Sequence, residues 1–215
     1  MSVYQLCYTN FIRETGNLVL EHYFTNNQNL KSELRDINFS LNENNFTFKS
    51  DNGVFSKNKI DYASLFLVKT FLTTNKKEFN NILDIGCGYG FIGITLSKLL
   101  NKHVDMFDIN KRAIHLCKMN IEINKVDATV DESNIYENVV NNYDLIITNP
   151  PIRAGKSVLM DFLKGGLARL NKDGELWFVI SKDQGAKSVK KELEKICTCE
   201  LIEKSKGFWV LSAKN

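Results

Sequence analysis

Proline is scarce in this chain of 215 residues, since it occurs only twice, at positions 150 and 151. Long apolar runs are missing as well, and no stretch approaches the roughly 18 apolar residues of a membrane-spanning helix. The first 20 residues contain Arg13, Glu14 and several asparagines where a secretory leader has an apolar core. We therefore expect no signal peptide, no membrane partner and a cytoplasmic location.

Cysteine is present, but its spacing does not fit a metal site. The five cysteines are scattered at positions 7, 87, 117, 197 and 199. One residue separates Cys197 from Cys199, whereas a zinc knuckle has two or more, and no histidine lies near them. We expect reduced thiols, as in other cytosolic proteins, and no bound metal.

Charge of one sign is not in large excess. The chain has 28 basic and 25 acidic residues, a net charge of +3, which permits a nucleic-acid partner without requiring one. Residues 182–206 hold seven lysines and five acids, and residues 1–57 hold five basic and six acidic residues. Linear charge alone therefore indicates no RNA-binding patch.

The composition, with 43% hydrophobic residues, is sufficient for one domain with a modest extension. Residues 37–41 and 46–49 alternate apolar and polar side chains around an asparagine-rich connection at residues 42–45. This pattern predicts a β-hairpin within an N-terminal extension, residues 1–57. The main domain is predicted to span residues 58–215, with its first helix beginning near Asn58 or Asp61.

From residue 81 onward, strands alternate with helices, a pattern typical of a parallel, doubly wound α/β sheet. The predicted helices cover residues 91–100, 111–124, 157–170 and 185–196. The predicted strands cover residues 81–85, 103–108, 128–131, 143–148, 175–180, 199–204 and 208–212. The last two strands are close enough to form a hairpin, which would add one antiparallel strand to a Rossmann-like sheet.

A glycine-rich turn, residues 86–90, follows the first of these strands and precedes a helix. Such a turn lets the backbone approach a ligand at the helix N-terminus. It also matches the dinucleotide fingerprint, but Asp84 lies inside the strand, where dinucleotide folds usually have a small apolar residue. Acids at Asp84 and at Asp108, which ends the second strand, favour S-adenosylmethionine over NAD. The structural alternative is that Asp84 caps the loop and Asp108 caps the next helix.

The two prolines follow the apolar strand 143–148 directly, as Asn149-Pro150-Pro151. Proline fixes φ and has no N–H, so the carbonyl groups at this strand end are held still. Two fixed acceptors suit the binding of an amide or exocyclic NH2 group while its nitrogen is attacked. The motif therefore indicates methylation of a planar amine.

These motifs resemble class I S-adenosylmethionine-dependent methyltransferases, and among them the RsmC-like small-domain 16S rRNA guanine-N2 methyltransferases. The resemblance extends from about residue 21 to the C-terminus and implies a seven-stranded sheet whose last strand is antiparallel. The glycine loop is generic to the class, whereas the segments 53–56 and 148–156 are more specific. The segments that carry the resemblance are 22–24, 53–56, 83–90, 107–110, 133–136 and 148–156.

For the cofactor, the resemblance implies that Asp108 holds the ribose of S-adenosylmethionine and that Ile109 packs on the adenine. The family usually has an aspartate after the third strand, which accepts a hydrogen bond from the adenine amino group. This chain has Asn134 there, whose amide oxygen can also accept. The residues implied around the methionine moiety are Asp84, Gly86, Cys87 and Gly88, with Asn149 near the methyl group.

For the target, the resemblance implies that Asn149 and the Pro150 carbonyl accept hydrogen bonds from the amine, with Pro151 making the turn rigid. Many amino-methyltransferases have an aromatic residue after the prolines, where this chain has Ile152. Phe55 is the candidate for stacking on the base, with core packing as its alternative. Arg153 is a candidate for contacting guanine or a phosphate, with an ordinary solvated loop as its alternative.

The resulting hypothesis is methylation of a guanine N2 amine in small-subunit rRNA by a monomer or homodimer. Adenine N6 and a protein glutamine amide remain alternatives, although Ile152 disfavours both. A non-catalytic RNA-binding ribosome assembly factor on the same fold is a further alternative. Such a factor would be recognised by the loss of Asp84, the glycines or Asn149, and all of these residues are present.

Overall fold

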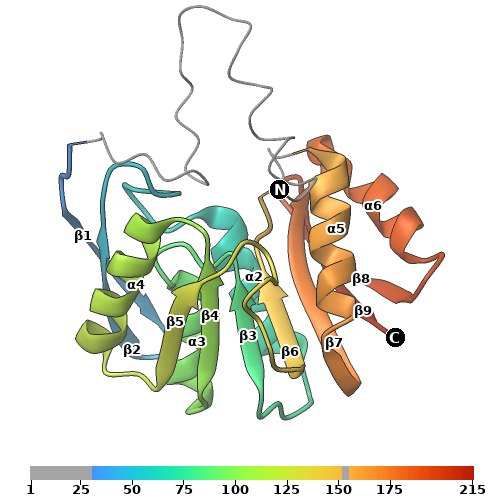
Figure 1. Cartoon of the computed structure of the whole chain (residues 1–215), viewed down its shortest axis with the longest axis horizontal. Helices are drawn as coiled ribbons and strands as arrows, with labels where there is room; N and C mark the ends of the chain where they lie inside the picture. The colour runs from blue at the N-terminus through green and yellow to red at the C-terminus, as the bar shows by residue number, and fades with distance from the viewer. Residues whose placement is uncertain (1–30, 152–154) are drawn as a thin grey trace, which may run out of the picture.

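The computed structural model describes residues 31–151 and 155–215 (Figure 1). No helix in these two ranges is long and apolar enough to cross a membrane. The elements in chain order are β1 (Arg35–Leu41), β2 (Asn44–Ser50), α2 (Tyr62–Thr74), β3 (Ile82–Ile85), α3 (Phe91–Leu100), β4 (Val104–Asp108), α4 (Lys111–Asn124), β5 (Ala128–Glu132), β6 (Tyr143–Thr148), α5 (Lys156–Leu167), β7 (Leu170–Ser181), the 3-10 helix η3 (Lys182–Gln184), α6 (Ala186–Leu193), β8 (Thr198–Ser205) and β9 (Phe208–Lys214).

Seven strands form one sheet in the order β5-β4-β3-β6-β7-β9-β8. The pairs from β5 to β7 are parallel, whereas β9 is antiparallel to both β7 and β8. The predicted doubly wound sheet with an antiparallel last strand is therefore confirmed. Sheet order reverses next to β3, where β4 lies on one side and β6 on the other, and an open α/β sheet binds its ligand at such a switch point.

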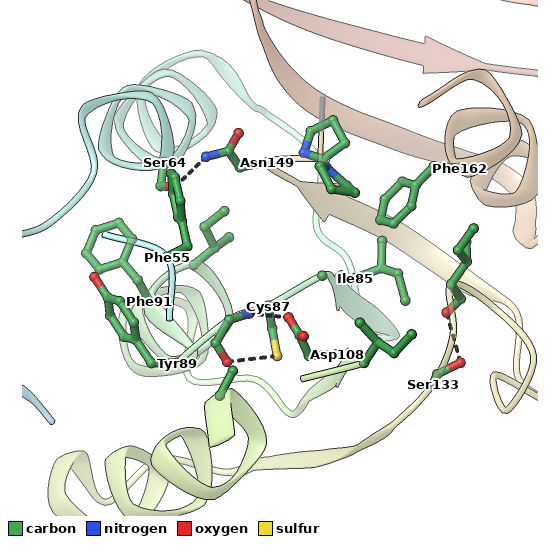
Figure 2. A pocket seen from close by; sticks show the side chains of 18 of the residues that line it. Phe55, Ser64, Ile85, Cys87, Tyr89, Phe91, Asp108, Ser133, Asn149 and Phe162 are labelled. Carbon is green, nitrogen blue, oxygen red and sulfur yellow. Dashed lines mark hydrogen bonds between the residues drawn. The ribbon is translucent and has the colours of Figure 1, made fainter. Parts of the chain in front are cut away.

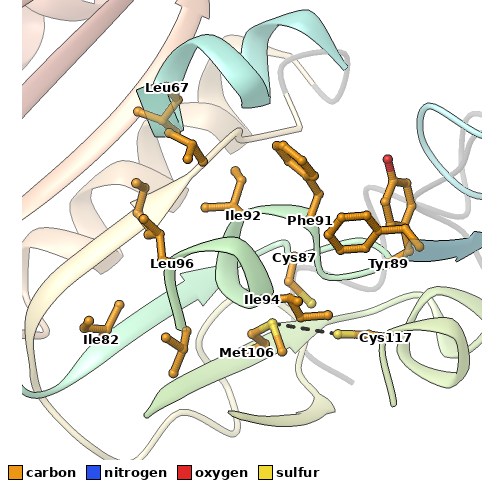
Figure 3. Packing of buried hydrophobic residues seen from close by; sticks show 14 of the residues in the cluster. Leu67, Ile82, Cys87, Tyr89, Phe91, Ile92, Ile94, Leu96, Met106 and Cys117 are labelled. Atoms are coloured by element: carbon orange, nitrogen blue, oxygen red, sulfur yellow. Dashed lines mark hydrogen bonds between the residues drawn. The ribbon is translucent and has the colours of Figure 1, made fainter. Parts of the chain in front are cut away.

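The sheet is buried on both faces, which explains its nearly continuous apolar strands. One hydrophobic cluster lies under α2, α3, α4 and the β1–β2 hairpin, and a second lies under α5 and α6. Along β3, Ile82 belongs to the first cluster, whereas Leu83 and Ile85 belong to the second. Figure 3 shows part of the first cluster, where α3 packs over Met106. Both faces of β3 are thus fixed, together with the loop that follows it.

The hairpin is tighter than the four-residue connection predicted from sequence. Leu41 is paired with Asn44, so only two residues form the turn. These residues, Asn42 and Glu43, have φ values of 48° and 62°. Two successive positive φ values match the right-handed twist of hairpin strands, and asparagine tolerates this conformation. The turn residues are therefore fewer than the polar composition indicated.

Two asparagines of α4 attach the hairpin to the main domain. Asn124 accepts from the Thr47 N–H and donates to the Thr47 carbonyl, over 3.1 and 2.8 Å. Asn120 makes the same pair of bonds with Lys49, over 2.6 and 3.0 Å. Residues four apart share one helix face, and residues two apart share one strand edge, so the spacings match. The two amides therefore bond backbone groups of β2 that a further neighbouring strand would otherwise bond.

Two helices end three residues earlier than predicted: α6 ends at Leu193 rather than at residue 196, and the boundary between α5 and β7 is shifted. The helix expected to end at residue 170 ends at Leu167, and β7 begins at Leu170 rather than at residue 175. Leu170 pairs with Tyr143, and the next pair is Leu145 with Glu175, so four residues of β7 bulge out of register. Leucines at positions 167 and 170 have helical spacing, which concealed this start of the strand.

Replacing Asn120 by alanine is expected to lower the free energy of unfolding by about 1–3 kcal/mol. The reason is that the change leaves the Lys49 N–H and carbonyl unpaired, together with the Tyr89 carbonyl that Asn120 also contacts over 2.8 Å. Urea denaturation followed by circular dichroism measures the effect. Lys118→Ala, on the exposed side of α4, is the matched control, and an equal effect of both changes would contradict this role of Asn120.

Candidate functional site

The loop between β3 and α3 has a conformation that only glycine adopts readily. Gly88 has φ +58°, and nothing lies within 4 Å of a Cβ atom built on it, so its outer side is open. Gly90 has φ +91°, and a Cβ atom there would lie 2.5 Å from Cys117 Sγ. The loop can therefore be approached closely from outside, while its inner side is packed against α4.

Asp84 lies beneath this loop rather than on the wall of a cavity. It is fully buried, and its Oδ2 accepts the Gly93 N–H over 2.8 Å. Its Oδ1 has no hydrogen-bond partner among the described residues. Burial is the main cause that raises the pKa of Asp84 from 3.8 to about 7, opposed by the Gly93 bond and aided by the nearby Asp108 carboxylate. Asp84 thus supports the first turn of α3, as in the loop-capping alternative.

Asp108 is at the carboxyl end of β4 and shapes the same loop. Its Oδ2 accepts the Gly88 N–H over 2.7 Å, and its Oδ1 accepts the Asn110 N–H over 2.8 Å. Burial raises its pKa despite these bonds. The N-cap of α4 is the Asn110 side chain, which accepts from the next turn, so helix capping is not the function of Asp108.

A cavity opens above the carboxyl ends of β3, β4 and β6 and brings most of the predicted site residues together (Figure 2). Asp84 is not among its lining residues, and Ile152 and Arg153 lie outside the described residues. The segment 22–24, which contributes to the resemblance, also lies outside them. The predicted residues that line the cavity are Phe55, Gly86, Cys87, Gly88, Asp108, Ile109, Asn134, Asn149, Pro150 and Pro151.

Two residues that the sequence reasoning missed orient Asn149. The Asn149 Nδ2 donates to Asp61 Oδ2 over 3.2 Å and to Ser64 Oγ over 2.9 Å. An ionised carboxylate only accepts, so the amide nitrogen faces Asp61 and the Oδ1 atom is turned away from it. The lone pairs of Oδ1 are thereby presented as the acceptor of this strand end.

Asp61 is held by the start of α2, of which it is the N-cap. Its Oδ2 accepts the Ser64 N–H over 2.8 Å and the Ser64 hydroxyl over 3.1 Å. The sequence signal was available, because Asp61 was one of the two residues expected to begin the helix. A capping aspartate is common, however, and nothing in the chain order indicated that α2 begins beside the end of β6.

The other end of the cavity is formed after β5. Asn134 donates through Nδ2 to Glu137 Oε1 over 3.0 Å, which leaves its amide oxygen as the acceptor group. Phe162 of α5 also lines the cavity, although sequence reasoning did not single it out, and its ring is 3.5 Å from a Cβ atom built on Gly86. In residues 31–151 and 155–215, no three His, Cys, Asp or Glu side chains are grouped as a metal site requires.

A family model, Methyltransferase small domain, matches residues 45–212, which is more than half of the chain. The chain belongs to this methyltransferase family. It is 38% identical over 199 residues to a Bacillus subtilis (strain 168) protein named uncharacterized protein YbxB, which covers 90% of this chain and 98% of the relative. That similarity spans nearly both whole proteins.

Relatives named for an activity are longer than this chain. Ribosomal RNA small subunit methyltransferase C of Buchnera aphidicola subsp. Cinara cedri is 37% identical over 178 residues, covering 80% of this chain and 50% of that relative. A structure of the Thermus thermophilus 16S rRNA N2 G1207 methyltransferase with AdoMet and guanosine has a TM-score of 0.75 and 23% identity. It covers 86% of this chain and 51% of that one, and it shows the shared fold.

The raised pKa of Asp84 predicts how stability depends on pH. Between pH values of about 4 and 7, the folded protein retains a proton that the unfolded chain has lost, so the stability contributed by this proton falls as pH rises through about 7. Asp84→Asn lacks this titration, and its stability relative to the native protein should rise between pH 5 and pH 8. Urea denaturation at both values tests this, with exposed Asp183→Asn as control. An equal change in the free energy of unfolding between pH 5 and pH 8 for the native protein and for Asp84→Asn would contradict this prediction.

Proposed function

We propose that this protein is an S-adenosylmethionine-dependent methyltransferase that methylates the exocyclic N2 amine of a guanine in small-subunit rRNA. The observation that carries the proposal is the Asn149 amide, which lines the glycine-loop cavity and whose nitrogen is bonded to Asp61 and Ser64. Membership of the methyltransferase family supports the reaction class. The names of the longer relatives, and the guanosine in the Thermus structure, support the target.

The cavity residues fit S-adenosylmethionine, which supplies a methyl group on a positively charged sulfur. Asp108 lies on the wall, and its two carboxylate oxygens retain acceptor capacity for a ribose hydroxyl beyond their bonds to backbone N–H groups. The orphaned Asp84 carboxylate under the loop favours a cationic ligand, because a nearby positive charge stabilises its ionised form. Ile109 supplies an apolar surface for the adenine, and Asn134 supplies an acceptor for its amino group.

The protein acts on the target amine by holding it rather than by strong base catalysis. Asn149 Oδ1 and the Pro150 carbonyl accept the two N–H bonds of the amine, which directs the nitrogen lone pair toward the methyl group. Both acceptors are fixed before the base arrives, one by Asp61 and the other by the proline pair. Positioning and preorganised dipoles of this kind are large contributors to enzymatic rates. Phe55, which lines the same cavity, offers its ring to the base.

Methyl transfer from radiolabelled S-adenosylmethionine tests the proposal directly. Unmethylated small subunits, naked 16S rRNA and bulk protein serve as parallel substrates, followed by nucleoside and amino-acid analysis. Label in N2-methylguanosine is the expected result. Label confined to N6-methyladenosine or to protein glutamine would contradict the guanine target. Binding of S-adenosylhomocysteine with no transfer to any substrate would favour the non-catalytic assembly factor.

Asp61→Asn is expected to lower the rate of methyl transfer by about 10²-fold, comparable to the loss of one preorganised polar contact. An asparagine at position 61 can present either end of its amide, so Asn149 is no longer held in one orientation. Affinity for S-adenosylhomocysteine, measured by calorimetry, should stay within error. Asp173→Asn, at an exposed position near the start of β7, is the matched control. Native rates in Asp61→Asn would show that orientation by Asp61 is not needed.

A further inference from the structure

Three lysines gather at the turn that joins β8 to β9. Lys204 and Lys206 belong to this segment, and the backbone N–H of Lys182 donates to the Gly207 carbonyl over 2.7 Å. All three lysines are exposed. The turn lies at the end of the sheet where Asn149 lies, because Ser181 at the end of β7 pairs with Phe208, and β6 runs parallel to β7. The fold thus concentrates charge that appeared dispersed along the sequence.

Two of these lysines lie over aromatic rings. Lys206 Nζ is 4.7 Å from the centroid of the Tyr62 ring, and Lys204 Nζ is 4.2 Å from that of Trp209. Both rings are half-buried, so they are anchored in the protein and yet reachable. Tyr62 is anchored by Phe66, stacked at 6.1 Å, and by its hydroxyl, which donates to Ser205 Oγ over 2.8 Å. Each ring thus has a cation beside it.

Tyr62 connects this turn to the candidate site. It directly follows Asp61, whose carboxylate accepts from the Asn149 amide. Two consecutive residues therefore link the candidate site to the β8–β9 turn. Asp61 bonds the Asn149 amide, and Tyr62 bonds Ser205 at the end of β8. Three acidic residues neighbour Tyr62 or the lysines in the sequence, and one of them, Asp61, is bonded to Asn149 and Ser64. Glu203 is engaged by the Thr70 hydroxyl over 3.0 Å, and Asp183 is exposed next to Lys182.

We propose that the first turn of α2 and the β8–β9 turn bind the single-stranded RNA that flanks the methylated base. We define this surface as Tyr62, Lys182, Lys204, Lys206 and Trp209. It runs around the end of the sheet, because Phe208, beside Tyr62, packs on the first hydrophobic cluster, whereas Trp209 packs on the second. Lysines pair with phosphates, and aromatic rings accept stacked bases, the combination found where proteins bind single-stranded nucleic acid. A lysine over a ring at the surface is held only weakly, so a base can take its place while the ammonium moves to a phosphate. The inference rests on the proposed function and adds the RNA path to it.

The test measures affinity for naked 16S rRNA against salt concentration. The double variant Lys204→Ala/Lys206→Ala should bind RNA more weakly, and the slope of log affinity against log salt should become shallower by about 1.4, or about 0.7 per lost phosphate contact. The matched control is Lys76→Ala/Lys172→Ala, two exposed lysines at the opposite end of the strands, after α2 and near the start of β7. The control should keep the native slope. Unchanged affinity for S-adenosylhomocysteine in both variants shows that the cavity is intact.

The stacking contribution is tested separately at Tyr62. Tyr62→Leu should lower RNA affinity by about 5- to 150-fold at constant salt slope, the range for one stacked base. Tyr62→Phe keeps the ring and loses only the bond to Ser205, so it should bind as the native protein does. Equal losses in both Tyr62 variants would overturn the stacking role.

The two proposals fail in different ways. Native protein that methylates rRNA, together with a lysine double variant of unchanged affinity and slope, would overturn the RNA surface and leave the proposed function standing. Native protein that neither binds nor methylates RNA would overturn both.

Discussion

Asp61 accepts hydrogen bonds from the Ser64 N–H, the Ser64 hydroxyl and the Asn149 amide, so one carboxylate both caps α2 and sets the direction of the amide at the end of β6. The rest of the site follows from this constraint. With its nitrogen occupied, Asn149 presents an oxygen acceptor beside the rigid prolines. The α2 helix, in turn, carries Tyr62 and thereby fixes where the β8–β9 turn lies relative to that acceptor.

The glycine loop, which forms the other half of the cavity, is supported by α4 and by the β1–β2 hairpin. The glycine loop packs on α4, and Asn120 of α4 bonds both the Tyr89 carbonyl of the loop and the Lys49 backbone of the hairpin. Phe48 of the hairpin lies against the rings of Tyr89 and Phe91. The hairpin is therefore part of the support of the loop and shares its hydrophobic cluster. Beneath the loop, a buried and half-satisfied carboxylate is a destabilising feature that suits a cationic ligand.

The sequence predicted the sheet and the loop well, because strand and helix periods, glycines and strand-end acids are local signals. The doubly wound fold with its antiparallel last strand followed from strand spacing alone. The start of β7 was missed, since Leu167 and Leu170 have helical spacing and the bulge depends on pairing with Tyr143. Asp61 and Ser64 were missed because their contact with Asn149 spans more than 80 residues of chain. The cluster of lysines at the β8–β9 turn was missed because charges were counted along linear segments. In the fold, Lys182 lies next to Gly207, which is distant in sequence.

The central claim is that Asn149 accepts from the N2 amine of guanine, and a binding cycle tests it most directly. Guanosine and inosine differ by that amine, and their affinities are measured by calorimetry for native protein and Asn149→Ala, both saturated with S-adenosylhomocysteine. The account predicts that native protein prefers guanosine by about 2 kcal/mol, the net value of two hydrogen bonds, and that Asn149→Ala keeps only about half of this preference, through the Pro150 carbonyl. An equal preference for guanosine in both proteins would contradict it.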